Sequence, residues 1–294
     1  MAEESPCLLV LNAAEGLLHI IIARQEADGA YTRLCAQSWH APTQGAELLT
    51  PALDHALQRL CIAPHDIGRI AAVRGPGSFT GLRLVLATAS GLARAIGALQ
   101  AGLDYLPLLA ASALYAIPAI AAFPRRVWVL THARRNLIHM QGFIENRTQD
   151  VSGGPLSLRP LCDILVCSPE EAALYLTRLE AEQPAAPDKA ASLVLGSGLT
   201  RNREGFVQAL QAEAKKSASP PPLLLPSSFD HPSPEALQDA ATNAVYGLVD
   251  PEPLYVRPAD AIDNLEKIAA SMGLDPEAAK KRFQELTGNG AEQG

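Results

Sequence analysis

The sequence predicts an α/β protein built from two lobes of similar construction. Of its 294 residues, 48% are hydrophobic, which is enough for a sizeable core. Short apolar runs typical of strands alternate with longer runs at helical spacing. A first pass of strands and helices is followed by a looser second pass in a similar order, and this repetition is typical of two mixed α/β lobes.

The first pass begins with strands and continues with alternating helices and strands. Three strands are predicted over Cys7–Leu11, Leu17–Ala23 and Tyr31–Trp39. A helix is predicted over 43–60, and Pro51 is expected to kink it or to start a second helix capped by Thr50. The pass continues with a strand over Arg69–Val73, a helix over 82–96, a strand over Leu99–Leu103 and a helix over Leu106–Ala122.

The second pass is interrupted by loops. Its predicted strands cover Arg126–Thr131, Leu137–Ile144, Ser192–Leu195 and Leu223–Leu225, and its helices cover Pro169–Arg178, capped by Ser168, and Pro234–Leu248, capped by Ser233. The stretch 145–190 is interpreted as loop insertions. We expect an N-terminal lobe over 1–105, a C-terminal lobe with insertions over 106–258, and a tail of two short helices over 259–294.

Composition excludes several classes of protein. The formal net charge of −7 argues against a surface that binds nucleic acid by itself. Five cysteines without CxxC spacing are typical of reduced thiols in a cytosolic protein. Glu3 and Glu4 stand where a secretion signal needs basic residues. The apolar run over 106–123 is interpreted as a buried helix rather than a membrane span, and no metal-ligand spacing occurs among the seven histidines.

The glycine-rich turn GPGSFTG, between the fourth strand and its helix, fits no familiar catalytic motif. It has no lysine for a phosphate-binding Walker loop, its glycines are spaced GxGxxxG rather than GxGxxG, and proline and threonine replace the glycines of a nucleophile elbow. What remains is a tight turn in which Ser78 or Thr80 caps the helix and free N–H groups could hold an anion. The residues of this predicted structural and anion-binding turn are Gly75, Gly77, Ser78, Thr80 and Gly81.

Small residues form a stripe along the helix that follows the turn. Ala87, Gly91 and Ala95 are spaced four apart, with Ser90 beside them. Gly91 is about 1 kcal/mol less favourable in a helix than alanine, so the close approach of another element is expected to matter. The spacing fixes the face but leaves open whether it packs inside the chain or against another subunit.

These residues resemble a known family. GPGSFTGLR followed by LATASGLA is similar to the hallmark stretch of the TsaB (YeaZ) proteins, and weaker landmarks over residues 7–258 follow in order. The resemblance implies the actin-like, sugar-kinase-like (ASKHA) fold, with a ribonuclease-H-like mixed sheet in each lobe. It also implies a role in forming threonylcarbamoyladenosine at position 37 of tRNAs that read ANN codons. There TsaB pairs with the metal-binding transferase TsaD, and the ATPase TsaE docks on the pair.

Two departures from the superfamily pattern indicate a non-catalytic chain. Where related proteins carry Asp-Thr in the first hairpin, this chain has Asn12-Ala13, and where Asp opens the second lobe it has His132. Without these carboxylates a metal-phosphate site is not expected. We therefore expect no cofactor, no bound metal and no catalytic residue. The alternatives are an active kinase or ATPase of this fold and a glycoprotease-like (M22) peptidase, although no nucleophile-base pair supports the latter.

Because the resemblance implies pairing with another protein, we expect the chain to act through a partner interface formed by its long helices. The predicted partner-interface residues are Leu49, Leu53, Arg83, Ala87, Ser90, Gly91 and Ala95. We expect a TsaD-type transferase as partner, a TsaE-type ATPase on the complex, and a homodimer through the same helices as a further possibility. Contact with tRNA is expected only through the complex, in the cytoplasm and without a membrane.

Overall fold

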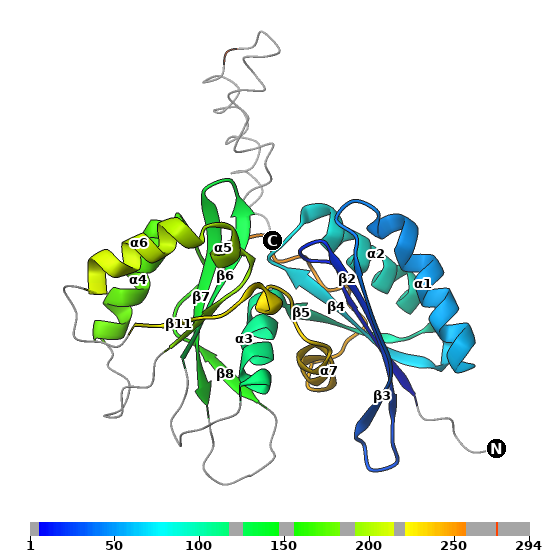
Figure 1. The fold of residues 1–294 in the computed structure, drawn as a ribbon. Helices are drawn as coiled ribbons and strands as arrows, with labels where there is room; N and C mark the ends of the chain where they lie inside the picture. The colour runs from blue at the N-terminus through cyan, green and yellow to red at the C-terminus, as the bar shows by residue number, and fades with distance from the viewer. Residues whose placement is uncertain are drawn as a thin grey trace, which may run out of the picture. The chain divides into compact units, whose positions relative to one another are not determined.

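A computed structural model describes residues 6–117, 126–146, 156–182, 192–214, 221–256 and 275 (Figure 1). The chain divides into two compact units, Met1–Leu254 and Tyr255–Gly294. The strands and helices of both sheets belong to the first unit, whereas the two helices predicted in the tail lie outside the described residues. The boundaries predicted for the two lobes and the tail stay a prediction.

The first sheet has five strands and two helices on one face. Its strands are β1 (Cys7–Asn12), β2 (Leu17–Gln25), β3 (Tyr31–His40), β4 (Ile67–Gly75) and β5 (Leu99–Asp104), in the order β3-β2-β1-β4-β5. The pairs β1–β2 and β2–β3 are antiparallel, whereas β1–β4 and β4–β5 are parallel. Along the chain, α1 (Gly45–Leu60) and a 3-10 turn (Pro64–Asp66) connect β3 to β4, and α2 (Phe79–Ile96) connects β4 to β5.

The second sheet repeats this plan. Its strands are β6 (Arg126–Arg134), β7 (Leu137–Asn146), β8 (Ser157–Pro160), β10 (Leu193–Leu195) and β11 (Leu223–Leu224), in the order β11-β10-β6-β7-β8, while β9 (Leu165–Cys167) pairs with β7. Counted from the other end, this order matches that of the first sheet strand for strand. The prediction of two similar mixed lobes is therefore confirmed.

Helices cover both faces of each sheet, because the central strands are apolar at successive positions and so carry apolar side chains on both faces. The remaining helices are α3 (Tyr105–Ala116), α4 (Pro169–Glu182), α5 (Ser197–Arg201), α6 (Arg203–Ala214), a 3-10 turn (Ser227–Phe229) and α7 (Pro234–Thr242). Side chains of α1 and α2 share one core with the first sheet. Side chains of α3 and α7 share a second core with the inner faces of both sheets, and α4, α5 and α6 cover the second sheet's other face (Figure 1).

Several element predictions need correction. The helix α1 runs unbroken through Pro51 and begins after Gln44, so no second helix starts at Thr50. The helix predicted to reach Leu248 ends at Thr242. The elements β8, β9, α5 and α6 were not predicted. The first three are short, and α5 begins within the Gly196-Ser197-Gly198 stretch, which is typical of a turn.

Candidate functional site

The glycine-rich turn after β4 packs directly against the turn that joins β1 to β2. The backbone N–H of Ser78 donates a hydrogen bond of 2.5 Å to the Ala14 carbonyl. A Cβ at Gly77 would lie 2.4 Å from that same oxygen, and a Cβ at Gly81 would lie 2.0 Å from the Ala13 carbonyl oxygen. Because only glycine permits such an approach, the turn is a structural elbow that seats the β1–β2 turn and directs α2.

The elbow uses several of its own polar groups. Ser78 is the N-cap of α2, as predicted, and its Oγ accepts a hydrogen bond from the Gly81 N–H at 3.3 Å. The Ser78 N–H is already bonded to the hairpin. Thr80 lies inside the first turn of the helix. An anion at this elbow would therefore need other N–H donors, and the anion-binding role of the turn stays a prediction.

Asn12, at the place where the family resemblance leads us to expect an aspartate, is hydrogen-bonded at both ends of its carboxamide within the hairpin. Its side chain is buried, its Oδ1 accepts a hydrogen bond of 3.0 Å from the Ala14 N–H, and its Nδ2 lies 3.0 Å from Nδ1 of His19. Burial, together with the nearby His231, lowers the pKa of His19 to about 4, so at neutral pH the ring is uncharged and can accept this bond. The carboxamide carries no charge and is bonded at both ends within the fold, unlike the carboxylates that hard divalent cations prefer.

A neighbouring carboxylate, Glu15, joins the two lobes. Its Oε1 accepts hydrogen bonds from Ser197 Oγ at 2.5 Å and from the His132 N–H at 3.3 Å. Its Oε2 accepts a hydrogen bond of 3.2 Å from the Tyr105 hydroxyl. These donors belong to α5, β6 and α3, so one side chain from the first sheet is tied to three elements. The pattern of a Glu-Gly turn carries no signal of this role.

Burial shifts the pKa values of Glu15 and of the neighbouring histidines toward their uncharged forms. Burial raises the pKa of Glu15 to about 7, and the hydrogen bonds from Ser197, Tyr105 and His132 only partly oppose that rise. Burial also lowers the pKa of His132 and of His231, and Arg201 adds to both shifts. At neutral pH these imidazoles are uncharged. The Glu15 side chain is thus occupied by the protein's own donors.

No group of three or more histidine, cysteine, aspartate or glutamate side chains that could hold a metal occurs within the described ranges. All five cysteines, which those ranges include, are free thiols.

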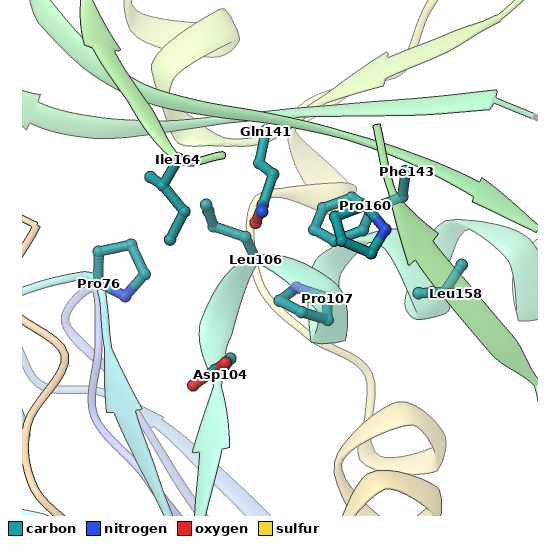
Figure 2. Close-up of a pocket in the computed structure, with 9 residues that line it drawn as sticks. All are labelled: Pro76, Asp104, Leu106, Pro107, Gln141, Phe143, Leu158, Pro160 and Ile164. Carbon is teal, nitrogen blue, oxygen red and sulfur yellow. The ribbon is translucent and has the colours of Figure 1, made fainter. Parts of the chain in front are cut away.

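A small cavity of about 250 Å³ opens between the two lobes (Figure 2). Its walls are mainly apolar and come from the elbow, the start of α3 and the second sheet: Pro76, Leu106, Pro107, Phe143, Leu158, Pro160 and Ile164. Its two polar side chains are already engaged, since Asp104 accepts a hydrogen bond of 2.6 Å from Arg74 and Gln141 donates one of 3.1 Å to the Cys162 carbonyl. The cavity is smaller than the roughly 300–1,000 Å³ typical of ligand pockets and offers little polar recognition.

The small-residue stripe lies on the outer face of α2. Ala87, Gly91 and Ala95 are exposed, and Ser90 is half-buried. A Cβ at Gly91 would meet nothing within 4 Å. The alternative in which the stripe packs inside the chain therefore has no support among the described residues, and the stripe forms a surface face.

The other predicted interface residues divide into two groups. Arg83 is exposed, and its guanidinium lies 3.8 Å from the ring centroid of Phe79, itself 45% exposed. Leu49 and Leu53, by contrast, are buried in the core against the first sheet. Their apolar spacing reflects internal packing, so these two leucines support α1 from behind rather than offer side chains to a partner.

One described helix, α2, is long and apolar enough to cross a membrane. Its Val85, Leu86, Ala89 and Ala93 pack in the core of the first lobe, so the helix is an integral layer of the α/β fold. The apolar run first considered as a span contains α3, which covers only 12 residues, and its residues beyond 117 lie outside the described part.

Comparison with known proteins points to one family. The model of the TsaD family, tRNA N6-adenosine threonylcarbamoyltransferase, matches residues 40–155. None of the curated proteins matches the chain significantly.

Solved structures share the fold. YeaZ from Pseudomonas aeruginosa has a TM-score of 0.59 and 21% identity, over 85% of this chain and 100% of that chain. A Pseudomonas aeruginosa protein described as similar to peptidase YeaZ has a TM-score of 0.59 and 20% identity, over 86% of this chain and 100% of that chain. A ROK hexokinase from Thermus thermophilus is more distant, with a TM-score of 0.40 and 15% identity over 81% of this chain and 97% of that chain. The predicted α/β fold is that of YeaZ, and the resemblance to the TsaB (YeaZ) proteins is confirmed.

Proposed function

We propose that this chain, which carries a TsaD-family region over residues 40–155 and the fold of YeaZ, is a non-catalytic partner subunit in tRNA modification. It acts by pairing with a TsaD-type transferase, which places the threonylcarbamoyl group on N6 of adenosine 37. The observation that carries the proposal is the combination of an exposed small-residue face on α2 with Asn12, which stands where the superfamily carries an aspartate and is hydrogen-bonded within the hairpin.

The absence of catalysis in the isolated chain follows from the chemistry of the hairpin. Phosphoryl transfer is catalysed largely by positioned charge, above all a metal ion held by carboxylates. Here the Asn12 carboxamide is bonded to Ala14 and His19, and Glu15 accepts hydrogen bonds from both lobes. The kinase or ATPase alternative would require these contacts to break before a metal could bind.

The outer face of α2 suits a helical partner. Small side chains let two helices approach closely, and this face presents Ala87, Gly91 and Ala95, all of them exposed. The occupant we propose is the TsaD-type subunit. A homodimer through the same face would compete with that pairing. A TsaE-type ATPase would dock on the pair, tRNA would be held only through the complex, and the location would be the cytoplasm.

A direct test is co-purification of the chain with a TsaD-type transferase, followed by sedimentation of the mixture. We expect a one-to-one complex. Peptide-hydrolysing or ATP-hydrolysing activity in the isolated wild-type chain, together with no complex at micromolar concentrations, would overturn the proposal in favour of an enzyme of the same fold.

A further inference from the structure

The segment that follows α7 exposes three aliphatic side chains within five residues. In this edge segment, which we define as residues 244–250, Val245 is 94% exposed, Leu248 78% and Val249 84%. Isolated exposed apolar residues are common on protein surfaces, but a contiguous set on an ordered segment marks an interaction site.

The edge segment is held in place by its backbone and its polar side chains. Gly247 and Gln100 of β5 exchange two backbone hydrogen bonds, of 2.9 and 2.8 Å. Asp250 accepts a hydrogen bond of 3.1 Å from the Gln100 side chain and forms an ion pair with Arg94 of α2. These bonds fix the segment along an edge of the first sheet, so its three aliphatic side chains are displayed rather than free to fold inward.

Inward-facing neighbours anchor the same segment. Tyr246 packs against the core, donates a hydrogen bond of 2.8 Å to the Ala241 carbonyl, and has the Arg69 guanidinium 5.1 Å from its ring centroid. Ala244 packs against the same core. Val245, between these two residues, is exposed to solvent.

The edge segment borders the outer face of α2. Its ion-pair partner, Arg94, stands on that face beside Gly91 and Ala95, and β5, to which it is bonded, is the outermost strand on that side of the sheet. Leu99, at the start of β5, is also exposed. The Arg94–Asp250 ion pair therefore joins the edge segment to the outer face of α2.

We propose that the edge segment is the apolar anchor of the surface that holds the TsaD-type partner, with Leu248 and Val249 packing beside the partner helix that covers α2. This inference rests on the proposed function and deepens it by adding residues that lie outside α1 and α2.

The charges near this surface favour a different protein over a second copy, a membrane or nucleic acid. The Arg94–Asp250 ion pair is internally compensated, Glu252 just beyond it is exposed, and each chain carries a formal charge of −7. Two copies would repel each other, and anionic lipids or phosphates would be repelled as well. A partner with an apolar centre and a basic rim fits.

The test compares serine variants in sedimentation with the TsaD-type partner. Leu248→Ser with Val249→Ser should weaken pairing at least ten-fold, since burying each side chain contributes to association. Leu174→Ser is the matched control, because Leu174 is also an exposed leucine, 47% exposed, but lies on α4 of the other lobe. The control should pair like the wild type. The melting temperature of all three isolated chains should be the same.

Each other outcome overturns the inference in a distinct way. If the wild type pairs and the double variant pairs equally well, only the edge-segment inference fails. If the wild type does not pair, the proposed function fails and takes this inference with it. A double variant that melts at lower temperature would mean that the chain itself covers these side chains. A double variant that loses self-association but keeps the TsaD-type partner would assign the surface to a second copy.

Discussion

Single residues decide what this fold can do chemically. Asn12 and Glu15 are three residues apart, and both have structural roles: one closes the hairpin, and the other ties the hairpin to the second lobe. In a catalytic relative of this fold, a carboxylate near this position has to remain available for a metal-phosphate group. In this chain the hydrogen bonds of Asn12 instead stabilise the hairpin, and those of Glu15 hold the hairpin against the second lobe.

Glu15 should make stability depend on pH near neutrality. Its pKa rises from 4.5 in the unfolded chain to about 7 in the folded chain, so between these values the folded state holds a proton that the unfolded state has released. Because the Glu15 carboxyl group is buried and little screened by solvent, stability is lost as pH rises from about 4.5 to 7, by on the order of 3 kcal/mol.

The variant Glu15→Gln isolates this effect, because glutamine keeps an acceptor oxygen and cannot ionise. We expect it to melt at higher temperature than the wild type above pH 7 and to approach the wild type near pH 5. Urea unfolding at several pH values measures the difference. Parallel pH profiles for the two proteins would mean that Glu15 is already ionised without penalty in the folded chain.

The glycines of the elbow and of the stripe should respond in opposite ways to alanine. Gly81→Ala would place a Cβ 2.0 Å from a hairpin carbonyl and should destabilise the chain by about 1–3 kcal/mol. Gly91→Ala, in the same helix, has open space and should stabilise it by up to about 1 kcal/mol. Thermal unfolding of the two variants, measured side by side, tests this prediction. Equal melting temperatures would show that the hairpin does not rest on the elbow.

At the scale of elements, the sequence pattern predicted what local chemistry controls. The strands of the first lobe, the helix after the elbow and its Ser78 cap all follow from spacing and capping residues, and all are confirmed. The role of Glu15 could not be predicted, because its donors Ser197 and Tyr105 are far away in sequence. Periodicity also misassigned Leu49 and Leu53, since an apolar stripe looks the same against a sheet as against a partner.

The helix α2 should lose its partner when its stripe is filled. Gly91→Leu adds a bulky side chain where a partner helix would approach, and overpacking of that kind costs about 1–3 kcal/mol. Pairing with the TsaD-type transferase should weaken about ten-fold or more. Because Gly91 faces open space and leucine favours a helix more than glycine does, the isolated variant should stay folded, with a melting temperature no lower than that of the wild type. A variant that unfolds alone would place the stripe in the core, and one that changes neither property would make it bare surface.

At the scale of the whole molecule, two similar lobes share a core through α3 and α7. The repeated sheet order was predictable because the element order recurs along the chain. That α7 and the edge segment pack back against the first sheet could not be predicted, because this packing depends on long-range contacts such as those between Gly247 and Gln100. The surface that we propose binds the partner is built partly from the edge segment.

The isolated chain should bind tRNA weakly. Its formal charge of −7 leaves few uncompensated cations to displace counterions from phosphates, so the dependence of binding on salt should be shallow. Fluorescence anisotropy with labelled tRNA at several salt concentrations measures both quantities. Submicromolar binding at physiological salt would mean that basic side chains cluster despite the acidic balance.

The most direct test of the central claim is reconstitution of tRNA threonylcarbamoylation with a TsaD-type transferase, a TsaE-type ATPase, the activated threonylcarbamoyl donor and tRNA. The account predicts modified adenosine when this chain is included, little without it, and none with this chain and donor alone. It also predicts that Asn12→Ala, which leaves no group for catalysis, keeps the activity of any complex that still forms, whereas Gly91→Leu reduces it in proportion to lost pairing. Full modification without this chain, or modification by this chain without the transferase, would contradict the account.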